Sequence, residues 1–159
     1  MEKNMHKINL VVVGGLKEKY FKEAENEYLK RLGRFAQVEI KEVNEFLSSS
    51  KISVEQIKRT ECEELLKKTS GFVVAMDKSG EVVSSEELSK LVSKTFTDGA
   101  KALTFVIGGS NGLTKEFLGR ADKVVSFGKI TYPHQLMRII LLEQIYRAET
   151  ILNNVTYHK

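Results

Sequence analysis

Cysteine and proline are nearly absent from this chain of 159 residues, which contains one of each. A single cysteine excludes an internal disulfide. Cys62 also lies among acidic residues, and negative neighbours disfavour a reactive thiolate. We therefore expect Cys62 to have no chemical role.

Long apolar segments are missing as well. No run reaches the length of about 20 residues that a membrane-spanning helix needs. The first residues, 1–7, lack the apolar core and the small-residue cleavage site of a signal peptide. We expect a cytoplasmic protein without a membrane partner, folded as a single domain over 1–159, because this length suffices for a sizeable core.

Histidine is scarce and scattered. His6, His134 and His158 have no metal-ligand spacing and no accompanying carboxylate cluster, so we expect no metal site. A nucleophile-elbow motif is also missing, which argues against catalysis by a Ser-His-Asp triad.

The charge is mildly basic, with a formal net charge of +4. A dedicated nucleic-acid binder would show a denser basic stripe. The excess of lysine and arginine is concentrated in 1–34. Contact with a polyanion and a merely soluble surface both remain open on this evidence.

Short apolar runs alternate with longer segments of helical period. The pattern predicts strands at 8–13, 38–43, 72–76, 102–107 and 124–127, and helices at 20–32, 53–68, 84–96 and 133–152. A turn is expected at 77–80. Apolar strands that alternate with helices favour a three-layer α/β domain with a mostly parallel sheet.

Two loops follow strands at the expected carboxyl edge of this sheet. Residues 108–112 read Gly-Gly-Ser-Asn-Gly, and 126–134 lead through the only proline, Pro133, into the last helix. The first loop matches neither the dinucleotide fingerprint nor the Walker motif. We expect Pro133 at the first helical position and the cap at Thr131 or Tyr132. Together the loops indicate a ligand pocket built from backbone, although plain connecting turns remain an alternative.

The last helix is apolar nearly all round, which predicts burial on two sides. A subunit interface and a central core helix both satisfy that pattern. Glu143 and Arg147 are spaced i, i+4 in the order that favours an ion pair.

Four motifs in order along the chain resemble the RlmH family of SPOUT-class methyltransferases. They are Ile-Gly-Gly-x-x-Gly-Leu at 107–113, Tyr-Pro-His-x-Leu-x-Arg at 132–138, Glu-Gln-x-Tyr-Arg-Ala at 143–148 and the terminal Tyr-His-Lys at 157–159. The resemblance extends over the whole chain. It implies a methyltransferase for N3 of a pseudouridine in large-subunit (23S) ribosomal RNA and a homodimer with composite active sites. Because a small domain of modest charge has little surface for reading RNA sequence, we expect it to act on the assembled ribosome, recognising shape and phosphates.

The resemblance also implies a deep trefoil knot in the C-terminal half and S-adenosyl-L-methionine as methyl donor. The residues that would bind this cofactor are Met76, Gly108, Phe127, Gly128, Lys129, Ile130, Thr131 and Tyr132. Met76 and Tyr132 replace leucines that are common in the family, and both keep the apolar bulk.

The same resemblance gives the catalytic candidates. His158 would act as the general base or position it, and Tyr157 would stack on or orient the nucleobase. Arg138 and Arg147, aided by Glu143, would hold phosphate or base oxygens. Without the resemblance, a frayed tail is the simpler interpretation of 157–159.

Three other functions compete with this one. The first is a SPOUT methyltransferase for another position in ribosomal or transfer RNA, and the second is a non-catalytic ribosome-binding factor. The third, a Rossmann-type nucleotide-binding enzyme, is disfavoured because the fingerprint and its ribose-binding acid are missing.

Overall fold

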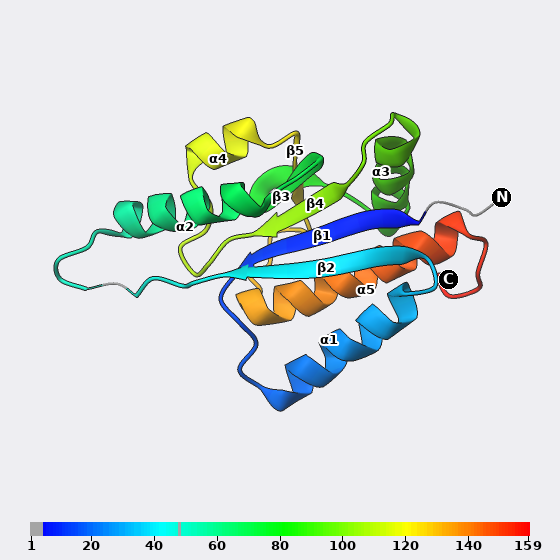
Figure 1. Ribbon diagram of the computed structural model, residues 1–159, viewed down its shortest axis with the longest axis horizontal. Coiled ribbons are helices and arrows are strands. Elements are labelled where there is room, and N and C mark those ends of the chain that lie inside the picture. The colour runs from blue at the N-terminus through cyan, green and yellow to red at the C-terminus, as the bar shows by residue number, and fades with distance from the viewer. Residues whose placement is uncertain (1–4, 48) are drawn as a thin grey trace.

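Five parallel strands form one sheet at the centre of the computed structural model, which describes residues 5–47 and 49–159. The strands are β1 (His6–Val13), β2 (Ala36–Val43), β3 (Phe72–Val82), β4 (Leu103–Ile107) and β5 (Lys123–Ser126). Their order across the sheet is β2-β1-β4-β3-β5 (Figure 1). All five carboxyl ends therefore meet at one edge.

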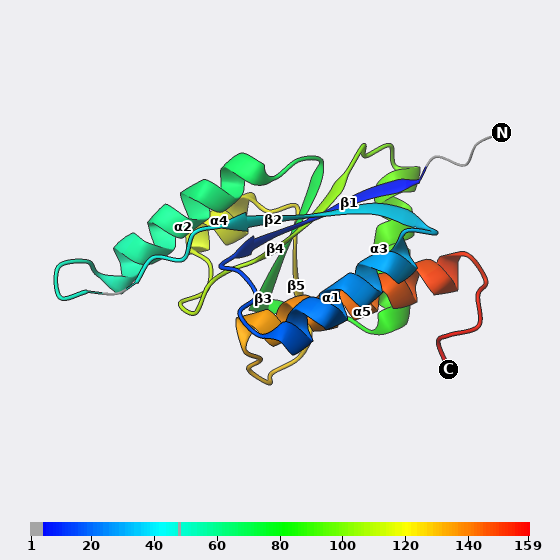
Figure 2. The same ribbon diagram turned by 60° about the horizontal axis from the view of Figure 1, so that its bottom comes forward.

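Helices cover both faces of this sheet, which confirms the predicted α/β class. They are α1 (Lys19–Leu32), α2 (Val54–Lys68), α3 (Ser85–Thr97), α4 (Lys115–Arg120) and α5 (His134–Leu152). Helices α2 and α4 lie on one face, and α1 and α5 lie on the other (Figures 1 and 2). Helix α3 packs against α5 and belongs to the second layer.

Strand β1 shows why the sheet needs two helical layers. Its side chains point alternately to opposite faces. Leu10 and Val12 join the core beneath α1, α3 and α5, whereas Val11 and Val13 join the core beneath α2 and α4. All four are at most 3% exposed. An unbroken apolar run is what a strand covered on both faces requires.

Strand β3 departs from the prediction of a strand followed by a turn. It continues to Val82, but Met76 and Glu81 both pair with Val125, so 77–80 form an excursion inside one long strand. The carboxylate of Asp77 accepts the Ser79 N–H at 3.0 Å within it. A Cβ on Gly80 would lie 2.6 Å from the Val124 carbonyl carbon, so β5 admits only glycine there.

Helices α2, α3 and α4 begin with a side-chain cap, whereas α1 and α5 have none. Ser53 and Ser84 each form a complete capping box at the start of α2 and α3. The short α4 was not predicted, although the Thr114 side chain caps it. The predicted cap of the last helix at Thr131 or Tyr132 was wrong, because Pro133 is the N-cap and α5 begins one residue later.

Helix α5 is a core helix in the single chain. Leu141, Leu142 and Ile145 are fully buried where α5 packs against the sheet, α1 and α3. Leu136 and Ile140, one turn apart, remain only half-buried. The sequence predicts that α5 is buried on two sides. In the single chain, the second of these sides is the half-buried stripe of Leu136 and Ile140. Among the described residues, none of the helices is long and apolar enough to cross a membrane.

Candidate functional site

A cavity of about 330 Å³ opens at the carboxyl ends of β3, β4 and β5. Both loops singled out in the sequence contribute to its wall, together with the start of α5. Its lining comprises Met76, Asp77, Lys78, Ile107, Gly108, Gly109, Ser110, Gly112, Leu113, Val125, Ser126, Phe127, Gly128, Ile130, Thr131, Tyr132, His134 and Met137. The predicted cofactor-binding residues are all among them except Lys129.

The glycine loop after β4 folds back on itself. The Gly112 N–H donates to the Gly109 carbonyl at 3.0 Å. A Cβ on Gly108 would lie 3.0 Å from the carbonyl carbon of Gly112 and 3.1 Å from a methyl carbon of Leu113. A side chain at Gly108 would therefore have to displace the Gly112 backbone or the Leu113 side chain by a few tenths of an ångström.

The second loop, 127–133, is held from two sides. The Ser126 hydroxyl accepts the Gly128 N–H at 3.1 Å, and Gly128 adopts a φ of +107°, which favours glycine. From β3, the Lys78 ammonium donates to the Thr131 hydroxyl across the cavity. The β3 excursion and this loop thus form opposing parts of one rim, with Lys129 on the exposed outer side.

The C-terminal tail folds back onto the last turns of α5. The Tyr157 hydroxyl donates to a Glu143 carboxylate oxygen at 3.0 Å, and Arg147 binds the same oxygen. The Arg147 guanidinium also lies over the Tyr157 ring, 4.8 Å from its centroid. The tail is therefore docked on α5 and not frayed. Four of the five predicted catalytic residues lie together, namely Glu143, Arg147, Tyr157 and His158.

His158 completes this cluster with both ring nitrogens engaged. Arg147 lies 3.2 Å from Nδ1, and a Glu86 oxygen lies 2.6 Å from Nε2. Because a guanidinium can only donate, Nδ1 accepts from Arg147 and Nε2–H donates to Glu86. The two partners therefore select one tautomer of the imidazole.

Charge and burial stabilise the protonated forms in this cluster. Burial raises the pKa of the Tyr157 phenol above its ordinary value, and its hydrogen bond to Glu143 adds to the effect. The hydrogen bond to Glu143 also raises the pKa of Arg147. Tyr157 thus stays a hydrogen-bond donor and Arg147 stays a cation at neutral pH.

Arg138, the fifth predicted catalytic residue, lies elsewhere. Its buried guanidinium contacts the carboxylate of Glu25 from α1 through two nitrogens, one of them at 3.2 Å. It also donates to Glu42 of β2 at 2.7 Å. Carboxylates therefore occupy the donors that phosphate would need. This placement does not support the predicted contact with RNA, and it makes Arg138 a structural link between α5, α1 and β2.

The cavity and the tail cluster lie on different turns of α5. Met137 is the last residue of α5 that lines the cavity, and the cluster residues Glu143 and Arg147 follow 6 and 10 positions later, roughly 9 and 15 Å along the helix. Figure 1 shows the start of α5 near the carboxyl ends of the strands and the C-terminus at the far end of the molecule. One chain does not bring its two sets of predicted site residues together.

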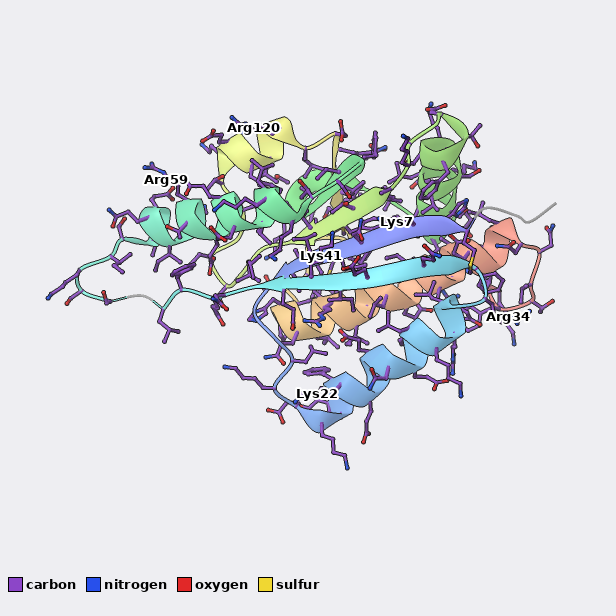
Figure 3. The ribbon with its side chains drawn as sticks, viewed as in Figure 1. Lys7, Lys22, Arg34, Lys41, Arg59 and Arg120 are labelled. Carbon is purple, nitrogen blue, oxygen red and sulfur yellow. The ribbon has the colours of Figure 1, made fainter. Side chains whose placement is uncertain are left out.

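Basic side chains are spread over the molecule. Figure 3 labels Lys22 and Arg34 on and after α1, Lys7 and Lys41 on the first two strands, and Arg59 and Arg120 on α2 and α4. Several lysines and arginines of the helices are paired with acids of the same helix. Among residues 5–47 and 49–159, no group of three or more His, Cys, Asp or Glu could hold a metal ion.

Comparison with known proteins decides the family. A family model described as "Predicted SPOUT methyltransferase" matches residues 6–158. This chain belongs to the SPOUT methyltransferase family. Ribosomal RNA large subunit methyltransferase H of Carboxydothermus hydrogenoformans is 47% identical to it over 157 residues, which are 96% of this chain and 99% of the relative. The protein of the same name from Ruminiclostridium cellulolyticum is 46% identical over 158 residues, with the same coverage. These matches confirm the RlmH resemblance.

Solved structures agree with the SPOUT assignment at the level of the fold. A probable methylase family protein from Haemophilus influenzae Rd KW20 aligns with a TM-score of 0.54 and 15% identity, covering 96% of this chain and 70% of that one. A probable methyltransferase from Bordetella pertussis Tohama I gives a TM-score of 0.55 and 9% identity, covering 90% and 96%. At these identities the likeness shows only the shared α/β architecture.

Several cavity and cluster residues of this SPOUT protein were not singled out from the sequence. Asp77 and Lys78 were assigned to a simple turn, and Glu86 reads as an ordinary residue in the first turn of α3. Glu61, which does not line the cavity but lies against its residue Gly109, did carry a signal, because it is a charged residue in register with the apolar face of α2. The contact between Glu86 and His158 spans 72 positions and leaves no local pattern.

The Glu86 contact makes a testable prediction about pH. The hydrogen bond from His158 lowers the pKa of Glu86 below its ordinary value of 4.5. A lowered pKa means that the contact is fully present above 4.5 and is lost as the pH falls through the lowered value. Replacing His158→Ala should move the pKa of Glu86 up toward 4.5, as followed by carbon NMR of the glutamate carboxyls. His6→Ala serves as the control, and equal Glu86 titration with and without His158 would show that the tail does not dock in solution.

Proposed function

We propose that this protein transfers a methyl group from S-adenosyl-L-methionine to N3 of a pseudouridine in large-subunit ribosomal RNA. The observation that carries the proposal is the near-full-length match to relatives named for methylating that RNA. The cavity at the carboxyl edge of the sheet supports it, because ligands of open α/β sheets bind at this edge. The deep trefoil knot and the cytoplasmic location that the family implies are part of the same proposal.

The cavity suits such a cofactor. Its volume lies within the range of small-molecule sites, and it combines apolar side chains such as Met76, Ile107 and Phe127 with polar backbone of two glycine-containing loops. Exposed backbone groups can bind an adenine edge and hydroxyls, while the apolar walls exclude water. When bound, the cofactor supplies an electrophilic methyl group on a positively charged sulfur.

The protein's own task is then to present the nucleobase and to remove its N3 proton. Holding two reactants in line can lower a barrier by up to about 7–11 kcal/mol, and a general base adds about 10²–10⁴-fold. In this proposal Tyr157 orients the base, Arg147 holds base or phosphate oxygens, and His158 accepts the proton. Glu143 aids by accepting hydrogen bonds from both Arg147 and Tyr157, which keeps these two side chains in place. His158 can accept the proton only after Nδ1 exchanges the Arg147 N–H for the N3–H, because Arg147 occupies Nδ1 in the single chain.

The separation of cavity and tail supports a homodimer with composite sites. Both belong to the proposed machinery, yet none of the cluster residues Glu143, Arg147, Tyr157 and His158 lines the cavity of its own chain. A second copy can bring its tail to the cavity of the first. The half-buried stripe of Leu136 and Ile140 on α5, together with exposed Ile130 at the cavity rim, supplies apolar surface for that contact.

The surface of this protein suits binding to a folded RNA–protein particle better than binding to free RNA. The net charge is only +4, and the basic side chains labelled in Figure 3 come from several elements instead of one dense stripe. A surface of this kind suits recognition of shape and phosphates better than reading of a sequence. The proposed substrate is therefore the assembled ribosome.

The activity itself is tested with ribosomes from a strain that lacks this protein. Incubation with the purified protein and S-adenosyl-L-methionine should add one methyl group to a pseudouridine of the large subunit, identified by mass spectrometry of the nucleosides. Naked ribosomal RNA should be a much poorer substrate. Methylation of a different nucleotide, or of transfer RNA, would assign the protein to another SPOUT activity, and cofactor binding without any methylation would indicate a docking factor.

The cofactor site is tested by Gly108→Ala. The added methyl would press on the Gly112 backbone, and overpacking of this kind typically costs about 1–3 kcal/mol, so affinity for S-adenosyl-L-methionine should fall roughly tenfold or more. The larger Gly108→Arg should abolish binding. Gly119→Ala is the matched control, since a Cβ there meets nothing within 4 Å. Calorimetry that finds equal affinity in all variants would refute the site.

The composite site is tested by mixing two inactive variants. Deleting 157–159 should lower methylation by about 100-fold or more while cofactor binding persists, because it removes the proposed base. Co-refolding this deletion with Gly108→Arg should restore roughly a quarter of the wild-type activity, since half of the dimers then contain one intact cavity facing one intact tail. Activity that stays absent in the mixture, with heterodimers verified, would mean that each tail serves its own chain.

A further inference from the structure

Glu61 is a buried carboxylate with an incomplete set of partners. It lies on α2 and is 2% exposed. One oxygen, Oε2, accepts the backbone N–H of Phe46 at 3.1 Å, whereas Oε1 has no hydrogen-bond partner. Burying a carboxylate without a counter-ion is costly, so such groups are kept mainly where they serve a site.

The position of Glu61 relates it to the cavity. A Cβ on Gly109 would lie 3.0 Å from Oε1 and 3.3 Å from Oε2, so the carboxylate rests directly against this glycine. Gly109 is itself part of the cavity lining. Because Gly109 has no side chain, the carboxylate contacts the backbone of a residue that lines the cavity.

Two further titratable groups surround this wall. Glu45 follows β2, and one of its oxygens lies 3.4 Å from the hydroxyl of Ser110, a lining residue. His134 enters from α5. Burial raises the pKa of Glu61; the Phe46 N–H opposes this, Glu45 reinforces it, and His134 opposes it. The charge state of Glu61 is therefore responsive to a cation placed near it.

We propose that Glu61 is a specificity-determining residue that makes the cavity prefer the cationic methyl donor over its neutral product. This inference rests on the proposed function. Transfer of the methyl group to the base nitrogen leaves the C–S bonding pair on sulfur, so the sulfonium becomes an uncharged thioether. The two molecules otherwise carry the same groups. The Glu61 carboxylate, which lies against Gly109, distinguishes the two molecules by their charge. It attracts the cationic donor and therefore strengthens donor binding, but it gives no such attraction to the neutral product, which is free to depart.

The experiment compares affinities for S-adenosyl-L-methionine and S-adenosylhomocysteine, measured by calorimetry at about pH 8. Glu61→Gln keeps the shape and the acceptor for Phe46 but removes the charge. We expect the donor-to-product affinity ratio to fall roughly tenfold, mainly through weaker donor binding, because one unit charge has about this effect on another at about 10 Å in a medium with an effective dielectric constant of about 20. Glu63→Gln, on the exposed side of the same helix, should keep the wild-type ratio. Glu61→Asp should keep most of it as well.

The outcomes separate the two proposals. If the wild-type protein binds neither molecule, the proposed function fails. If it binds both and Glu61→Gln leaves the ratio unchanged, the role of Glu61 is overturned while the function stands.

If Glu61→Gln does not fold, lowering the pH neutralises the Glu61 carboxylate in the protein that keeps it. With His134→Gln to silence the histidine, the ratio should then fall as the pH drops from about 8, before it reaches the ordinary glutamate value of 4.5. A ratio that stays flat over that range would also overturn the inference.

Discussion

The structure depends on a fully parallel sheet covered on both faces. Parallel neighbours cannot be joined by hairpins, so every connection must cross a face of the sheet and the loops that precede each crossing gather at one edge. The glycine loop after β4 and the loop after β5 meet there for this reason, and the excursion inside β3 joins them because it lies beside the end of β5. A site made of backbone is thus a consequence of strand direction, since none of these loops approaches the others in sequence.

Much of this arrangement was predictable from residue patterns. Strands such as β1 are apolar without interruption, and Ser53 and Ser84 mark helix starts through a local hydrogen bond, so both signals lie within a few residues. The order of strands and the pairing partners of charged side chains carry no such signal. Arg138 illustrates this, because its partners lie 113 and 96 positions away and nothing near it in the sequence indicates these ion pairs.

In the candidate site, too, some residues could be predicted from the sequence and others could not. Gly108 and the loop 127–132 could be named from the sequence because a family resemblance marks them, and the structure places all but Lys129 around one cavity. The resemblance says nothing of what holds them. Lys78 reaching Thr131, and Glu61 lying against Gly109, arise from packing of segments that are distant in sequence. Support of this kind becomes visible only in three dimensions.

Helix α5 acts as a fixed spacer, and this limits how the sequence can vary. Its first turn lines the cavity, and its middle turns carry Glu143 and Arg147, which hold the tail. Inserting or deleting one residue between them would rotate one end against the other by about 100° and shift it by about 1.5 Å. We expect length changes among homologues to be excluded from α5 and tolerated in surface connections such as the one between β2 and α2.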